Sequence, residues 1–240
     1  MRPLVIVPTY NERENVAPLM TALLTIASLR VLVVDDQSPD GTADAADALA
    51  ATSQGRISVL RRTGTRGLGR SYVEGMRAAL ASDATHICQM DADFSHDPSE
   101  LPRLLDASTS ADLVIGSRYV RGGTLHNWPI HRVLLSAVAN WYVRAITRLP
   151  IHDCTSGFRC WSRDLLARLP LESIVSDGYA FLVETIWEAS AAGGRIAEVP
   201  ITFVERREGR SKLSTRVIGE SVVLPWRLAA RPAARARPGR

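Results

Sequence analysis

Short apolar stretches alternate with longer amphipathic segments along the first 120 residues. The apolar stretches are rich in β-branched residues and end in polar ones, as buried strands do. They lie at residues 3–10, 30–38, 56–62, 86–90 and 112–118. The segments between them have apolar residues at helical spacing and lie at 15–29, 40–53, 67–82 and 97–108. This alternation predicts an α/β fold with a mainly parallel sheet.

The regular alternation of short apolar and longer amphipathic segments ends after residue 120. Different elements are predicted there: a long amphipathic helix at 128–150, a polar loop at 153–164, a helix at 178–194 and a closing strand at 195–206. The stretch 227–240 is low in complexity, and we expect disorder there. We therefore expect one domain over 1–216, followed by a basic tail over 217–240 that is partly disordered.

Composition places the chain among globular proteins. Of its 240 residues, 46% are hydrophobic and 22% are charged. Cys88, Cys154 and Cys160 have no spacing typical of disulfides or zinc sites, which favours a reducing, intracellular compartment. No signal peptide is apparent, and no apolar run reaches the ~18 residues of a membrane-spanning helix. We therefore expect a cytoplasmic protein that does not cross a bilayer by itself.

Charge is distributed unevenly along the chain. From Arg206 onwards there are ten basic and two acidic residues, which gives +8 here and −4 before it out of a net +4. A basic segment favours an anionic partner, either nucleic acid or lipid headgroups. Because no base-reading motif accompanies it, we expect an anionic membrane surface and no nucleic acid.

Three carboxylates follow the fourth predicted strand directly. Asp91, Asp93 and Asp97 occur within seven positions, although aspartate is a poor strand former. They indicate either a solvated turn with a helix cap or a divalent metal at the carboxyl end of a parallel strand, where such sheets bind ligands. The acids at 35–36 fall at the same edge, which favours a metal for Asp91 and Asp93. Asp97 precedes a proline and is expected to cap the next helix.

Six motifs resemble those of the polyprenyl- (dolichyl-) phosphate mannose synthases, which are inverting glycosyltransferases of the GT-A type, family 2. Between about residues 4 and 215 they are VPTYNERENV, VVDDQSPDGT, QMDADFSHDP, VIGSRYV, DCTSGFR and FVERREGRSKLS. The resemblance implies a single-domain α/β/α sandwich, with a nucleotide-sugar half at 1–120 and an acceptor half at 121–216. It also implies transfer of mannose from GDP-mannose to a polyprenyl monophosphate at the cytoplasmic face of a membrane.

The same resemblance implies a metal-dependent donor site. Asp91 and Asp93 match the D-x-D pair that holds Mg²⁺ or Mn²⁺ on the donor pyrophosphate, and carboxylate oxygens suit either ion. Ser95 stands where the family often has glutamine, and it is the implied third ligand. The residues implied to bind the nucleotide are Pro8, Tyr10, Glu12, Val34, Asp36 and Ala92. Common turns at 9–12 and 35–41 would explain the same residues without any ligand.

Basic residues further along are implied to contact phosphates. Arg118 follows the fifth predicted strand, and Arg206 and Lys212 match a loop over the site. Lys212 is the only lysine among 29 Lys and Arg residues, which indicates a position that needs a compact charge. The residues implied for the acceptor are Arg132, Asp153, Ser156 and Arg159. The five histidines have no ligand spacing, and we expect none to be catalytic.

Two alternative functions are compatible with these motifs. One is a polyprenyl-phosphate glucosyltransferase that uses UDP-glucose, and the other is a nucleotide-binding module without turnover. An acceptor phosphate is mostly ionised near neutral pH, so it can attack the sugar without a protein base. The aromatic and basic helix at 128–148 and the basic tail are expected to dock on the membrane, unless a membrane-spanning partner protein is required.

Overall fold

The computed structural model describes residues 1–174, 176–205 and 215–231. Its central sheet has seven strands in the order β3-β2-β1-β4-β7-β5-β8, and β6 and β9 form a second, two-stranded sheet. The strands are β1 (Pro3–Thr9), β2 (Arg30–Asp35), β3 (Ile57–Arg61), β4 (His86–Gln89), β5 (Leu113–Ser117), β6 (Thr124–His126), β7 (Arg159–Ser162), β8 (Ile196–Pro200) and β9 (Thr202–Val204). The helices are α1 (Arg13–Leu24), α2 (Thr42–Thr52), α3 (Leu68–Ala81), the 3₁₀ turn η1 (Pro98–Glu100), α4 (Leu101–Ala107), α5 (Ile130–Thr147), α6 (Arg163–Leu166), α7 (Gly178–Ala191) and α8 (Thr215–Ala230).

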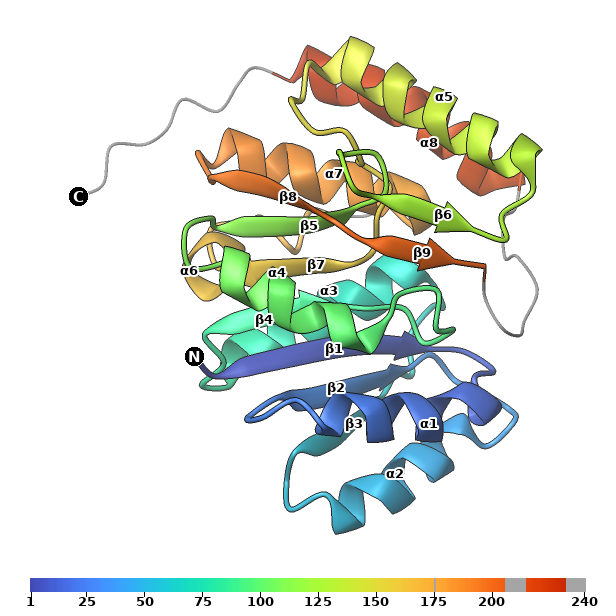
Figure 1. Cartoon of the computed structure of the whole chain (residues 1–240), viewed down its shortest axis with the longest axis vertical. Coiled ribbons are helices and arrows are strands. Elements are labelled where there is room, and N and C mark those ends of the chain that lie inside the picture. Colours follow the sequence, from blue (N-terminus) through green and yellow to red (C-terminus); the bar gives the residue numbers. More distant parts are fainter. Residues whose placement is uncertain (175, 206–214, 232–240) are drawn as a thin grey trace.

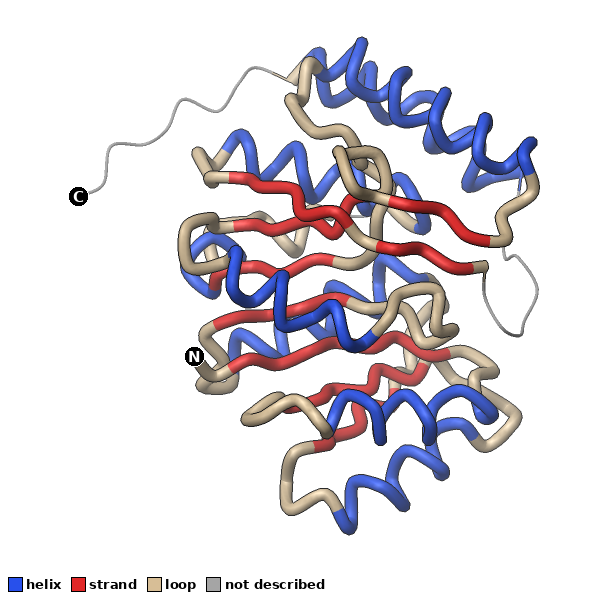
Figure 2. Tube along the Cα trace, viewed as in Figure 1, coloured by secondary structure: helices blue, strands red, loops and turns tan. Residues whose placement is uncertain are grey.

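Helices cover both faces of the large sheet. Figures 1 and 2 show α1, α2 and α4 on one face, with α3 and α7 on the other. Alternate side chains of β1 point into the two layers, Val5 and Val7 toward α1 and Ile6 toward α3. Both faces of the strand are therefore apolar, as in a parallel sheet covered on both sides. The expected α/β/α sandwich is confirmed.

One strand runs against the others and was not predicted. β4 pairs in parallel with β1, whereas β7 lies antiparallel between β4 and β5. The sequence predicted a polar loop over 153–164, and this is wrong for Arg159–Ser162. Trp161 is fully buried in the strand and donates its indole N–H to Gln89 Oε1 at 2.7 Å. The segment is mostly polar and its strand has only four residues, so the sequence pattern did not indicate a strand there.

The closing strand predicted over 195–206 is two strands in two sheets. β8 pairs in parallel with β5, and β9 pairs in parallel with β6. Pro200 ends β8, and because proline has no amide hydrogen it cannot extend a ladder on both sides. The chain therefore leaves the large sheet at Ile201, whose amide still donates to Ser117 O at 3.1 Å.

The C-terminal segment is folded further than the sequence predicted. α8 crosses the expected boundary at residue 216 and continues to Ala230, into the stretch expected to be disordered. Leu224 and Leu228 are buried in the layer that holds α7. Arg231 pairs with Glu188 at 2.8 Å and Glu184 at 3.3 Å, so it contacts protein. Residues 232–240 of the predicted tail lie outside the described residues.

None of the helices in the described parts of the chain is both long and apolar enough to cross a bilayer.

Candidate active site

The D-x-D pair lies in a tight turn just beyond β4. Ala92 is buried, and the two aspartates on either side of it are half-buried. Phe94 has a positive φ of 59°, which turns the chain so that the Ser95 amide donates to Asp93 Oδ1 at 3.1 Å. This is the carboxyl end of a strand, where the sequence predicted a ligand site.

Asp97 has the separate structural role that the sequence predicted for it. Its side chain accepts a hydrogen bond from the Ser99 amide at 2.8 Å and caps η1. The prediction of a helix cap at this position is confirmed. The third carboxylate of the segment therefore belongs to the fold rather than to the pair at 91 and 93.

Asp91 is contacted by Tyr72 and Gly157, which are distant in the sequence, and by His96, which is five positions away. Tyr72 of α3 donates its hydroxyl hydrogen to Asp91 Oδ1 at 3.1 Å, and His96 Nδ1 lies 4.0 Å from Asp91 Oδ2. Gly157 packs so closely that a Cβ there would lie 3.3 Å from Asp91 Oδ2. The Asp91 side chain is still 35% exposed, so one side of the carboxylate remains accessible.

His96 and Tyr72 were not predicted as site residues. His96 is buried, stacks on Phe158 and meets the edge of Phe203, and its Nδ1 has no hydrogen-bond partner among the described residues. Burial lowers the pKa of His96, which favours its neutral form. Tyr72 reaches Asp91 only through the packing of α3, whereas His96 lies in the same motif as Asp91 but has no ligand spacing that would have marked it.

The donor set at the turn fits a divalent cation with hard ligands. Mg²⁺ is usually held by one or two protein carboxylates together with substrate phosphates. Asp91 and Asp93 supply two carboxylates, and the described ranges contain no group of three or more His, Cys, Asp or Glu arranged to hold a metal ion. Ser95 lies in the same turn but is 3% exposed, and its proposed role as a third ligand stays a prediction.

The residues predicted for the nucleotide converge at the ends of β1 and β2. Pro8 and Val34 are buried in paired strands, opposite one another in the register. Asp36 follows β2; it is bonded to Arg62 and accepts from the Gly67 amide at 2.8 Å. Asp35 is buried and bonded to Thr9 Oγ1 at 3.0 Å, consistent with a structural role.

Tyr10 and Glu12 lie in the turn between β1 and α1. The Arg66 guanidinium carbon is 4.7 Å from the centre of the Tyr10 ring, and Arg66 also bonds to the Tyr10 hydroxyl. Glu12 accepts from Asn15 Nδ2 at 2.9 Å. An aromatic ring, a cation and carboxylates therefore meet beside the end of β2, which is a suitable environment for a nucleoside.

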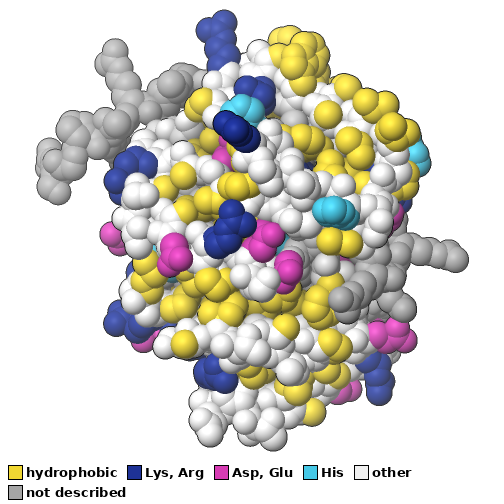
Figure 3. Space-filling model, in the orientation of Figure 1, with side chains coloured by type: hydrophobic (Ala, Val, Ile, Leu, Met, Phe, Trp, Pro, Cys, Tyr) yellow, Lys and Arg dark blue, Asp and Glu magenta, His cyan; other side chains and the backbone are white. Residues whose placement is uncertain are grey.

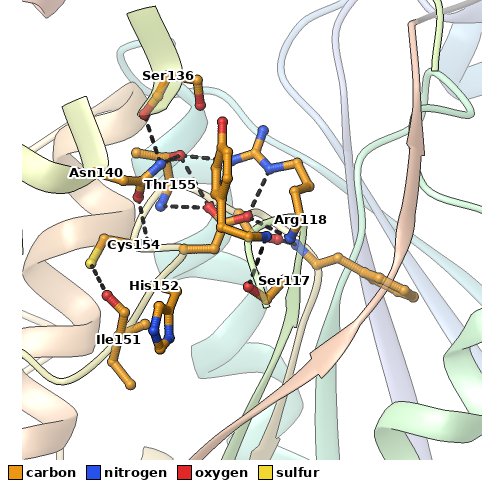
Figure 4. A network of polar contacts seen from close by, with 12 residues as sticks. Ser117, Arg118, Ser136, Asn140, Ile151, His152, Cys154 and Thr155 are labelled. Carbon is orange, nitrogen blue, oxygen red and sulfur yellow. Dashed lines mark hydrogen bonds and ion pairs between the residues drawn. The ribbon is translucent and has the colours of Figure 1, made fainter. Parts of the chain in front are cut away.

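Arg118, directly after β5, forms a buried ion pair with Asp153 of the acceptor half. The guanidinium donates to both carboxylate oxygens at 2.7 Å, and the Arg118 amide donates to Oδ2 at 3.0 Å. Arg118 also donates to Thr155 Oγ1 at 2.7 Å; Figure 4 shows these side chains turned toward one another. Burial by itself would raise the pKa of Asp153, but the Arg118 charge holds the pKa below its usual value.

Ser156 and Arg159 follow Asp153 in the chain. Arg159 is fully buried and donates to Ser156 O at 2.8 Å, Thr185 Oγ1 at 2.9 Å and Leu182 O at 3.0 Å. Burial lowers the pKa of Arg159 to about 10, so it is charged near neutral pH. The structure places this guanidinium beneath the 153–156 loop rather than at its surface, and a contact with an acceptor stays a prediction.

The remaining predicted cations are split between the described and undescribed parts. Arg132 lies on α5, where Nη1 is 2.8 Å from Glu205 Oε1. Arg206 and Lys212 lie outside the described residues, so their predicted contacts with phosphate are not placed. Glu205, the last residue described before them, lies next to α5.

Known proteins match most of this chain in sequence. The model of glycosyl transferase family 2 matches residues 4–169. The chain is 46% identical over 230 residues to a polyprenol monophosphomannose synthase of Mycolicibacterium smegmatis, which covers 94% of this chain and 86% of that protein. It is 47% identical over 240 residues to an undecaprenyl-phosphate mannosyltransferase of Micrococcus luteus, which covers 96% of each.

Solved structures support the fold. A glucosyl-3-phosphoglycerate synthase from Mycobacterium tuberculosis, in complex with Mn²⁺, UDP and glucosyl-3-phosphoglycerate, superposes with a TM-score of 0.69 over 96% of this chain and 80% of that chain. The sequence identity is 18%, so this likeness concerns the GT-A fold alone. Together with the near full-length relatives, it confirms the resemblance drawn from the motifs: the chain belongs to glycosyl transferase family 2 and has the GT-A fold.

Proposed function

We propose that this protein transfers mannose from GDP-mannose to a polyprenyl monophosphate and inverts the anomeric centre. The observation that carries the proposal is the near full-length similarity to two mannosyltransferases that are named for a polyprenyl or undecaprenyl acceptor. The arrangement of the site supports it, because the predicted nucleotide residues and the Asp91–Asp93 pair lie at one edge of the sheet.

The donor is held from both ends in this proposal. Tyr10 and Asp36 contact the nucleoside, and Asp91 and Asp93 hold a Mg²⁺ or Mn²⁺ ion against the pyrophosphate. That ion supplies charge stabilisation for the leaving diphosphate. Tyr72 fixes the orientation of Asp91, so that the carboxylate is in position before the donor arrives.

The acceptor needs no general base. A phosphate monoester is mostly ionised near neutral pH, and its oxygen attacks the anomeric carbon as the bond to the diphosphate breaks. The protein contributes alignment and cations. Arg118, implied to contact the phosphates, is held in one orientation by Asp153 of the acceptor half. Arg206 and Lys212 are assigned to the phosphates by resemblance.

The proposed place of action is the cytoplasmic face of an anionic membrane. The donor is water-soluble, whereas a polyprenyl phosphate keeps its chain in the bilayer. Basic residues toward the C-terminus would attract the protein to anionic lipid by up to ~1 kcal/mol each. A membrane-spanning partner protein is the alternative means of attachment.

The function is tested by measuring donor binding and then transfer. Thermal unfolding is followed with GDP, UDP or NAD, each with and without Mn²⁺. We expect GDP with Mn²⁺ to stabilise the protein most, and labelled mannose from GDP-mannose to appear on a lipid-extractable phosphate acceptor. Stabilisation by UDP and transfer from UDP-glucose would replace the mannose proposal with the glucosyltransferase. Binding of a nucleotide without transfer from either donor would indicate a module without turnover.

A further inference from the structure

Two helices on one side of the molecule expose a group of large apolar side chains. We call this group the α5–α8 face; its members are Ile130, Leu134, Leu135, Val138 and Trp141 of α5 with Val222, Val223 and Trp226 of α8. Their exposed fractions run from 47% for Val223 to 78% for Ile130. Figure 3 shows hydrophobic side chains gathered at the upper edge of the molecule, where Figure 1 places α5.

The two helices form one structural unit. Trp226 Nε1 donates to the Tyr142 hydroxyl at 2.8 Å, and that hydroxyl donates to Val222 O at 2.8 Å. Only Asn140 and Val143 of α5 are fully buried, although the helix has 18 residues. Exposed apolar groups of this kind mark interaction sites on proteins, whereas single exposed apolar residues do not.

We propose that the α5–α8 face inserts into the headgroup layer of a lipid bilayer, an inference that rests on the proposed lipid acceptor. α5 contains no Asp or Glu, and it carries Arg144 in its last turn with exposed Arg148 as its cap. Trp141 of this face precedes Arg144 by three positions on α5, and Trp226 of α8 is bonded to Tyr142. Tryptophan and arginine next to an aliphatic stripe are typical of helices that lie in the membrane interface.

The opposite side of α5 connects this face to the acceptor half of the site. Asn140 Nδ2 donates to Thr155 Oγ1 at 3.1 Å, and Asn140 Oδ1 accepts from the Cys154 amide at 2.7 Å. Thr155 in turn accepts from Arg118 at 2.7 Å. A bilayer against the outer side of α5 therefore lies one helix away from the Arg118–Asp153 pair, and a lipid phosphate at headgroup depth is close to its proposed partners.

Apolar insertion differs from attraction by a basic tail in its response to salt. Screening shortens the range of charge interactions to about 3 Å at 1 M salt, whereas burial of aliphatic and indole groups does not need a charged partner. We expect wild-type protein to co-sediment with vesicles of anionic and neutral phospholipid, with more bound to the anionic ones. A substantial fraction remains bound to both at 1 M salt.

The first experiment removes apolar surface without changing charge. Leu134→Gln with Val138→Gln is compared with Ala48→Gln and Ala51→Gln, two exposed positions on α2 at the far end of the molecule. We expect the first pair of substitutions to weaken vesicle partitioning by about tenfold or more, because each CH₂ group buried in the bilayer makes the transfer free energy more favourable. The α2 pair should bind as wild type does. Equal binding of both doubly substituted proteins, or no binding by wild type, overturns the proposal.

The second experiment separates docking from catalysis. Each protein is assayed with a short-chain, water-soluble prenyl phosphate and with a long-chain one embedded in vesicles. Leu134→Gln with Val138→Gln should keep wild-type turnover on the short acceptor and lose about tenfold on the embedded one. Equal losses on both acceptors contradict docking through this face. If wild type turns over neither acceptor but still binds vesicles through these residues, the proposed function fails and the docking surface stands.

A second copy of the chain is the competing occupant. Light scattering of wild type and of the doubly substituted α5 protein decides this. A wild-type dimer that becomes a monomer on substitution, with vesicle binding unchanged, overturns the membrane proposal.

Discussion

The Tyr72 hydroxyl donates a hydrogen bond to Asp91 Oδ1 at 3.1 Å, and this bond ties α3 to the turn after β4. Tyr72 is itself fixed by a stacked contact with Phe181, at 5.7 Å between ring centres. Burial, and then the Asp91 charge, raise the pKa of the Tyr72 hydroxyl, so it remains a donor across the neutral range. One carboxylate of the proposed metal pair is thus held in orientation by a helix outside its own segment.

Tyr72→Phe removes this donor and little else. We expect the concentration of Mn²⁺ needed for half-maximal transfer to rise about 10-fold or more, because loss of a partner that orients a ligand has effects of 10–100-fold. Stability should change by only about 1 kcal/mol. The measurement is the initial rate against Mn²⁺ concentration with a water-soluble acceptor. Tyr142→Phe, which alters a tyrosine between α5 and α8, is the matched control. An unchanged Mn²⁺ requirement in Tyr72→Phe would contradict the role of Tyr72 in orienting Asp91.

Asp91→Ala or Asp93→Ala should abolish metal-dependent transfer and leave the fold intact. Neither carboxylate caps a helix, whereas Asp97 does. Asp97→Ala is therefore the control, and it should lose about 1 kcal/mol of stability while keeping its activity. Rates are measured after EDTA treatment with Mg²⁺ restored, and circular dichroism checks the fold. Near-normal rates in either Asp91→Ala or Asp93→Ala would show that the metal assignment is wrong.

Asp153→Asn should destabilise the protein by about 3–5 kcal/mol, because it leaves the Arg118 charge buried without its partner. The exposed pair of Asp112 and Arg195 provides the control, and Asp112→Asn should change stability by about 1 kcal/mol or less. Urea unfolding near neutral pH measures both. Similar small losses in the two variants would mean that the buried pair contributes no more than a surface one.

The same pair predicts how stability responds to acid. The pKa of Asp153 is lower in the folded protein than the value of 3.8 expected for an unfolded chain. The pair therefore contributes its full stability above 3.8, and the contribution is lost as the pH falls below that value. Asp153→Asn lacks this contribution at every pH. The difference in unfolding free energy between wild type and Asp153→Asn should shrink between pH 5 and the most acid pH at which both remain folded; a constant difference would contradict the assignment.

Lys212→Arg should retain the charge and still lose about tenfold in rate, because a guanidinium does not fit a site for a compact ammonium. Lys212 lies outside the described residues, so the prediction depends on the resemblance and on the composition. Turnover at saturating donor measures the effect. Arg210→Lys, the reverse exchange two residues away, serves as the control. Unchanged turnover in Lys212→Arg would show that this position does not require a lysine.

Much of the fold could be predicted because its signals are local. A run such as 30–38 carries its own β-branched residues and its own polar end, and the carboxylates at 91 and 93 follow their strand directly. The site residues from β1, β2 and β4 come together because parallel strands share one edge. The resemblance of the motifs indicated which substrates and ions these residues are expected to bind, which periodicity does not reveal.

β7 could not be predicted in the same way. Arg159 is charged and reads as a loop residue, yet it is fully buried. Its guanidinium is satisfied by oxygens of Leu182 and Thr185, which lie more than 20 positions away and reach it only once α7 packs on the sheet. A buried charge is acceptable only when it is fully partnered, and the local sequence supplies only the carbonyl oxygens of Ser156 and Cys154. Tyr72 was missed for a similar reason, because it reaches Asp91 from α3.

The sequence by itself determined that α5 is an amphipathic helix with aromatic and basic residues. Only the tertiary structure decided which side of the helix faces the protein. The polar side of Asn140 is turned inward, where the loop of Cys154 and Thr155 offers it hydrogen bonds. Ile130, Leu134 and Trp141 consequently point outward and remain exposed. Periodicity places these residues on one side of the helix, but the bonds that Asn140 makes with a distant loop determine that this side is the outer one.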